Sequence, residues 1–192
     1  DQGASAATEI DNLVAACRRA RARGDLDQAT DVLQTAWIGL KVKGLFSTAI
    51  ELASDIQVHG ALTDHAAGRL KLVVGSALNA VGKIESAEKH LLEGLSRALG
   101  AGDSLLVGEL RSALGDNLAT AGQMDVAAEY YEHALATARR FDAAALSRNV
   151  FTCLVALPNS LGHLHPAQYP YTAPPPWPPR PHHRPWHDAS PG

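Results

Sequence analysis

Proline is absent from the first 157 residues of this 192-residue chain, and all 11 prolines fall at or after Pro158. Because a proline inside a helix costs about 3 kcal/mol or more, this absence leaves a long segment that can be helical almost anywhere. The segment is rich in Ala, Leu, Glu, Arg and Gln, and no window shows the strict alternation of apolar and polar residues typical of a half-buried strand. The composition therefore predicts an all-α body.

Cysteine is scarce, and charge of one sign does not dominate. Cys17 and Cys153 lie far apart without a CxxC pair, so the sequence indicates neither a disulfide framework nor a cysteine zinc site, and it favours a reduced, cytoplasmic interior. We expect both to be small buried residues. With 17 Lys and Arg against 20 Asp and Glu, the net charge of -3 is too near neutral to indicate a basic nucleic-acid surface.

Long apolar runs are missing too. No run approaches the roughly 20 residues that span a bilayer, and the first residues lack the basic-then-apolar pattern of a signal peptide. We therefore expect no membrane segment. The chain also begins without Met, which favours a segment of a longer protein.

Glycine predicts where the helices end, because glycine takes the left-handed backbone conformation at a helix C-terminus without steric cost. The expected stops are Gly24, Gly44, Gly60, Gly82, Gly100 with Gly102, Gly122, and a junction at 139–142. This spacing predicts eight helices, at about 5–23, 26–42, 45–59, 63–81, 83–99, 103–121, 123–140 and 142–157.

An internal repeat of 40 residues is the strongest signal in the chain. The segments 68–99 and 108–139 share small or apolar residues at Gly68/Gly108, Leu70/Leu110, Gly75/Gly115, Leu78/Leu118, Gly82/Gly122, Ala87/Ala127, Leu95/Leu135 and Ala98/Ala138. Surface positions differ freely, as expected where packing alone fixes a repeat. A glycine inside a helix costs about 1 kcal/mol relative to alanine, so Gly75 and Gly115 predict close approach of a neighbouring helix.

These positions resemble the tetratricopeptide repeat. Its pattern of small, bulky, glycine, alanine, bulky and alanine positions is matched by Gly115, Leu118, Gly122, Ala127, Tyr131 and Ala134, nearly as well by Gly75, Leu78, Gly82, Ala87, Leu91 and Gly94, and more weakly by Trp37, Leu40, Gly44 and Ala49. The 40-residue spacing resembles long-helix variants in bacterial regulators. The resemblance implies an α-α solenoid of antiparallel hairpins, with another α-solenoid or a helical bundle as the alternatives.

The repeat and the prolines divide the chain into three parts. Residues 1–25 are expected to form one helix, either a cap or the second helix of an upstream unit, and 26–157 to form the repeats. Pro158 cuts the last helix short, and the Pro- and His-rich tail at 158–192 should be extended or disordered. A metal-dependent or enzymatic role of this tail is a further hypothesis, which deletion of the tail would test.

Catalytic motifs are missing, so no enzyme activity, cofactor or metal is expected. A phosphate loop ending at Gly82 and Lys83 would need glycine where Ala77 stands and Ser or Thr where Ile84 stands. The sequence contains no GxSxG and no HExxH motif.

The resemblance implies instead a protein or peptide partner held on the concave face, which the first helix of each pair lines. The polar residues at the corresponding positions are Asp31, Gln34, Lys41, Arg69, Ser76, Asn79, Glu109, Ser112, Asp116, Thr120, Asn149 and Thr152. Each could also be an ordinary solvated helix residue. We expect an interaction scaffold without direct nucleic-acid contact; the alternative is a regulatory or sensory segment of a larger bacterial signalling or transcription-regulator protein.

Overall fold

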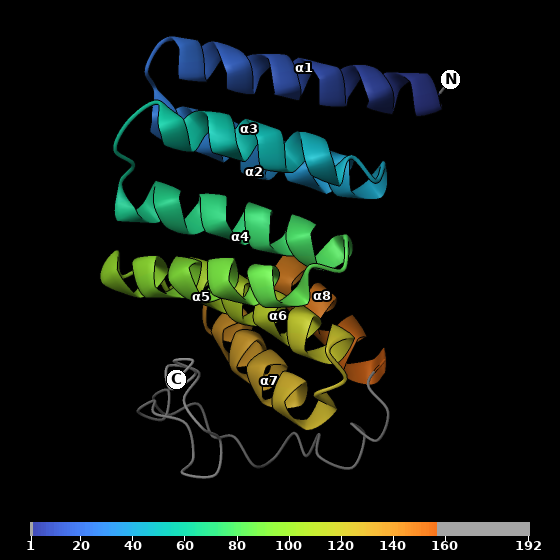
Figure 1. The fold of residues 1–192 in the computed structure, drawn as a ribbon. Helices are drawn as coiled ribbons and strands as arrows, with labels where there is room; N and C mark the ends of the chain where they lie inside the picture. Colours follow the sequence, from blue (N-terminus) through green and yellow to red (C-terminus); the bar gives the residue numbers. More distant parts are fainter. Residues whose placement is uncertain (1, 157–192) are drawn as a thin grey trace, which may run out of the picture.

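The computed structural model describes residues 2–156, which form eight α-helices and no strand (Figure 1). The helices are α1 (Gln2–Ala22), α2 (Leu26–Val42), α3 (Phe46–Val58), α4 (Asp64–Ala80), α5 (Ile84–Gly100), α6 (Ser104–Thr120), α7 (Met124–Arg140) and α8 (Ala144–Ala156). The all-α prediction is confirmed, and the helix limits agree to within three residues. The tail at 158–192 lies outside the described residues.

Most helices end as the glycine pattern predicts. Gly24, Gly44, Gly82, Gly102 and Gly122 have φ between 68° and 80°. The residue after each glycine returns its N–H to the preceding helix; the N–H of Lys83, for example, donates to the carbonyl of Leu78 at 2.9 Å. This bond closes the turn and directs the chain into the next helix.

Two junctions differ from the expected pattern. Gly60 does not take the left-handed conformation: α3 ends at Val58, and Thr63 caps α4 by accepting a hydrogen bond from the N–H of Ala66 at 3.2 Å. After α7 the left-handed position is held by Asp142, with φ of 50°. Aspartate is one of the few residues that tolerate this conformation, so the junction forms without glycine.

Successive helix pairs stack as repeating units. We call α2 with α3 the first unit, α4 with α5 the second, α6 with α7 the third, and α8 the incomplete fourth. The first helices of the units pack in a row, α2 on α4, α4 on α6 and α6 on α8. The second helices lie on one side of this row, and α3 is seen in front of α2 in Figure 1. This arrangement is an α-α solenoid.

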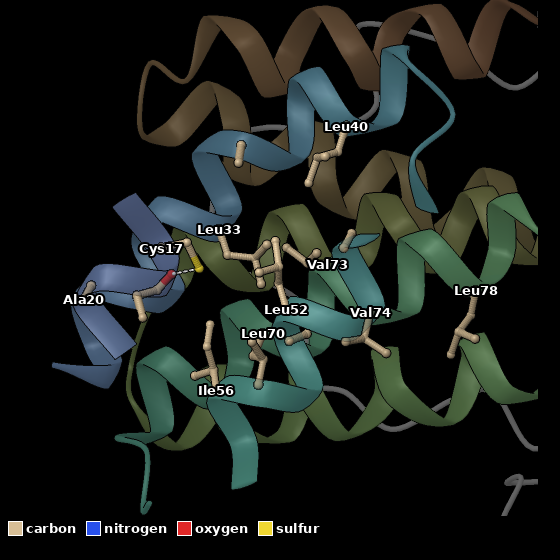
Figure 2. Close-up of a cluster of buried hydrophobic side chains, with 14 of the residues drawn as sticks. Cys17, Ala20, Leu33, Leu40, Leu52, Ile56, Leu70, Val73, Val74 and Leu78 are labelled. Atoms are coloured by element: carbon tan, nitrogen blue, oxygen red, sulfur yellow. Dashed lines mark hydrogen bonds between the residues drawn. The ribbon is translucent and has the colours of Figure 1, made fainter. Parts of the chain in front are cut away.

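The apolar interior is divided into three clusters along the solenoid. The first joins α1 to α4 and the start of α5 around Leu33, Leu52 and Leu70 (Figure 2). Cys17 lies in this cluster, almost fully buried, and donates to the carbonyl of Ala29 at 3.4 Å. The other clusters lie between α5 and α6 and among α6, α7 and α8.

The glycines within helices confirm the expected close packing. A Cβ added at Gly75 would lie 2.5 Å from Cγ of Leu91, and one at Gly115 would lie 2.6 Å from the ring of Tyr131. Since real contacts are longer than this, both positions require the absence of a side chain. The missing side chains therefore let α4 approach α5 closely at Leu91, and let α6 approach α7 closely at Tyr131.

Candidate functional site

The face made by the first helices of the units is curved inward. Nε2 of Gln34 on α2 donates a hydrogen bond of 3.1 Å to Oε2 of Glu109 on α6, although α4 packs between these two helices. Helices separated by a third lie about 16–20 Å apart, which is too far for side chains from a flat row to meet. The row therefore bends toward this side, which we call the concave face.

Four of the expected site residues converge on this face. Besides the Gln34–Glu109 bond, Nη1 of Arg69 on α4 pairs with Oδ1 of Asp31 on α2 at 2.7 Å. Burial raises the pKa of the Glu109 carboxyl, and the nearby Arg69 and the bond from Gln34 only partly oppose this effect. Glu109 therefore holds its proton more tightly than an exposed glutamate.

A shallow open depression of about 240 Å³ lies beside these residues, lined by Asp31, Gln34, Thr35, Ile38 and Arg69. Ile38 is 71% exposed, and Val42, one turn further along α2, is 82% exposed. Sequence reasoning selected only polar residues and missed this apolar pair. Ile38 and Val42 follow Gln34 at intervals of four residues, which places all three on one face of α2. This spacing could have identified them from the sequence.

Two polar atoms at the depression are buried and have no hydrogen-bond partner among the described residues, namely Oε1 of Gln34 and Nε of Arg69. The first is an acceptor and the second a donor. Buried polar groups without partners cost about 1–3 kcal/mol each, so both side chains gain if they turn toward a ligand that offers a donor and an acceptor.

Asp116 is engaged within the protein instead of facing the groove freely. Its Oδ1 accepts hydrogen bonds from the hydroxyl of Tyr131 on α7 at 2.7 Å and from Sγ of Cys153 on α8 at 3.4 Å. Burial and the Asp116 charge raise the pKa of the Cys153 thiol to about 11, while Lys41 on α2 acts in the opposite direction. Cys153 is half-buried against the last apolar cluster, so the expectation of a small buried residue is met only in part there.

The remaining expected residues are divided between internal contacts and open positions. Ser112 is buried and accepts a bond from Nδ2 of Asn149 at 3.4 Å, which links α6 to α8. Thr120 and Thr152 donate to carbonyls of their own helices. Lys41 is exposed, whereas Ser76 and Asn79 are half-buried.

Metal and membrane features can be assessed for residues 2–156. In this range no group of three or more His, Cys, Asp or Glu side chains is placed to hold a metal ion. None of the described helices is long and apolar enough to cross a membrane. The histidines of the tail lie outside the described residues.

The stacked hairpins and the curved inner row define a helical-repeat protein. Residues 67–140 match the family model described as "Tetratricopeptide repeat", so the second and third units are tetratricopeptide-like repeats. Repeats of this kind generally mediate protein–protein interaction. The solved structure "Crystal structure of MamA" is similar at 16% sequence identity, with a TM-score of 0.43 and coverage of 71% of this chain and 89% of that chain. The search of curated proteins found no significant match.

Proposed function

We propose that the concave face binds an extended peptide segment of a partner protein at the depression between α2 and α4. An apolar side chain of the peptide packs on Ile38 and Val42, and its backbone bonds to Gln34 and Arg69. The observation that carries the proposal is the exposed side chain of Ile38 in an open depression that the polar side chains of Gln34 and Arg69 also line. A peptide group offers one N–H and one C=O, which can bond to the amide oxygen of Gln34 and to the guanidinium of Arg69 when these two side chains turn toward the peptide.

The size of the depression favours a peptide over a small-molecule ligand. Sites for drug-sized ligands usually enclose about 300–1,000 Å³ and bury most of the ligand. The depression measures about 240 Å³ and is open. It suits one or two side chains of a longer segment that continues along the row of helices.

The experiment is selection of a random peptide library on the protein, followed by affinity measurement by fluorescence anisotropy. Selected peptides are expected to share one apolar anchor. I38D should weaken their binding about tenfold or more, because packing of an apolar side chain contributes about 1.5–3 kcal/mol. The matched control is V58D, since Val58 at the end of α3 is an exposed apolar residue like Ile38 (82% against 71%) but does not line the depression.

Equal binding by wild type and I38D would contradict the proposal, and so would a V58D variant that loses binding as severely. Folding of each variant is checked by circular dichroism, because both substitutions are at exposed positions and should leave the helices intact.

A further inference from the structure

Gln34 is bonded to Glu109 and also lines the depression in which the proposed peptide lies. Its Nε2 donates to Oε2 of Glu109 at 3.1 Å, while its Oε1 is buried and has no partner among the described residues. The amide has to rotate before this oxygen can accept a peptide N–H, and the rotation moves Nε2 away from Glu109. Gln34 therefore leaves Glu109 when it turns to the peptide.

Glu109 loses support for its charge in that step. Burial raises the pKa of the Glu109 carboxyl, Arg69 lowers it, Asp103 raises it further, and the hydrogen bond from Gln34 lowers it. Among the described residues, Gln34 is the one that donates a hydrogen bond to this carboxyl. A donor to a carboxylate favours the charged form, so removal of Gln34 favours the protonated form. A neutral carboxyl is also less costly to leave half-buried than a carboxylate.

The charged groups that act on Glu109 come from α4 and from the start of α6. They are Arg69 on α4, and Asp103, which caps α6 and lies 2.7 Å from Nδ1 of His65. Arg69 is itself paired with Asp31 on α2 at 2.7 Å. No charged side chain of the described residues on α5, α7 or α8 acts on Glu109. When Arg69 also turns toward the peptide, both groups that favour the carboxylate move away.

We infer that Glu109 couples peptide binding to proton uptake: ionised Glu109 holds Gln34 away from the peptide, and Glu109 takes up a proton from solvent as Gln34 turns to the peptide. This inference rests on the proposed function, since it concerns the same depression. The affinity for the peptide should consequently rise as the pH falls. Glu109 is thus a positioning residue of the peptide site, which acts through Gln34.

The test uses an uncharged peptide with blocked ends and one apolar anchor, taken from the library selection, so that the ligand itself does not titrate. Isothermal titration calorimetry between about pH 5 and pH 8, in buffers of different ionisation enthalpy, counts the protons taken up on binding. Wild type should take up protons and bind about tenfold tighter at the acidic end, because the bond to ionised Glu109 is not lost there.

Two variants isolate Glu109 in this experiment. E109Q should bind the peptide without this proton uptake and with one affinity across the pH range, because residue 109 can no longer ionise. E51Q is the matched control, since Glu51 is exposed on α3 and does not line the depression, and it should behave as wild type.

The outcomes separate this inference from the proposed function. Binding that I38D weakens, but whose heat and affinity depend on buffer and pH equally in wild type and E109Q, would overturn the inference and leave the proposed function intact. Binding that I38D does not weaken would remove both.

A second measurement needs no peptide. The Glu109 carboxyl carbon is titrated by NMR in wild type and in Q34M, whose side chain has the same length but no donor. The pKa of Glu109 should be higher in Q34M because its charged form loses that bond. T35V is the control, since Thr35 also lines the depression but its hydroxyl donates to the carbonyl of Asp31. Equal titration of Glu109 in wild type and Q34M would overturn the inference.

Discussion

Gln34 and Glu109 lie 75 positions apart in the chain, yet the amide of Gln34 donates a hydrogen bond of 3.1 Å to the carboxylate of Glu109. The bond crosses α4 and connects the first unit directly to the third. It also holds a half-buried carboxylate, with a raised pKa, against Gln34, which lines the proposed peptide site.

Stability should therefore depend on pH through Glu109. Its pKa is raised in the folded protein, chiefly by burial, so the folded state binds this proton more tightly than the unfolded chain. The resulting stabilisation is present below the ordinary value of 4.5 and is lost as pH rises through the folded pKa. We predict that E109Q and wild type have equal free energies of unfolding in urea at acidic pH. At pH 7, E109Q should be the more stable of the two. A less stable E109Q at pH 7 would show that attraction to Arg69 exceeds the cost of burial.

Gly115 should not tolerate alanine although it lies within a helix. Alanine improves helix propensity by about 1 kcal/mol, but its Cβ would lie 2.6 Å from the Tyr131 ring. Overpacking of this kind costs about 1–3 kcal/mol, so a net loss of stability is expected in urea unfolding. The control is G100A, whose Cβ would meet only Asp64 at an ordinary 3.6 Å and which should be neutral or stabilising. Equal effects of both substitutions would contradict the packing argument.

The left-handed turn positions predict opposite effects at two junctions. G122A should destabilise by about 1–2 kcal/mol although its Cβ would meet nothing within 4 Å, because alanine is strained at a φ of 80°. D142G relieves the same strain at φ of 50° and is expected to be neutral or slightly stabilising, since glycine also increases the entropy of the unfolded chain. Thermal unfolding of both variants tests this; a destabilised D142G would mean that the Asp142 side chain itself holds the turn.

The Cys153 thiol should react slowly with alkylating reagents. A pKa of about 11 instead of 9.0 leaves about 100-fold less thiolate at pH 8, and the greater nucleophilicity of that thiolate restores about tenfold, so a net tenfold slower reaction is expected. D116N should accelerate alkylation by iodoacetamide, measured at the Cys153 peptide by mass spectrometry. The exposed-site variant D125N is the control. No acceleration in D116N would indicate that burial alone sets the reactivity.

Much of the fold could be predicted because its determinants are local. Gly82 and Gly122 end helices through their own backbone freedom, and Gly75 and Gly115 signal close packing through their missing side chains. The prediction of a left-handed turn at Gly60 was wrong because contacts elsewhere set this connection. Thr63 caps α4, and its hydroxyl also donates to Oδ1 of Asp27 on α2 at 3.1 Å.

The site was less predictable because it depends on curvature. The repeat register places Asp31 and Arg69 on one side of the row, but only the accumulated bend between units brings Gln34 to Glu109. Asp116 was expected in the groove, yet it bonds to Tyr131, whose hydroxyl reaches it from α7. The corresponding residue in the second unit is Leu91, which has no hydroxyl, so comparison of the two repeats does not predict this hydrogen bond.

The division of the apolar interior into three clusters has a consequence for how the molecule opens. Each cluster involves neighbouring helices, so α8 can detach at the cost of the last cluster while the one around Leu33 and Leu70 stays closed. Amide hydrogens of α8 should consequently exchange with solvent deuterium through an opening of lower free energy than those of α4. Protection against exchange should therefore be graded along the chain instead of being lost in one cooperative event.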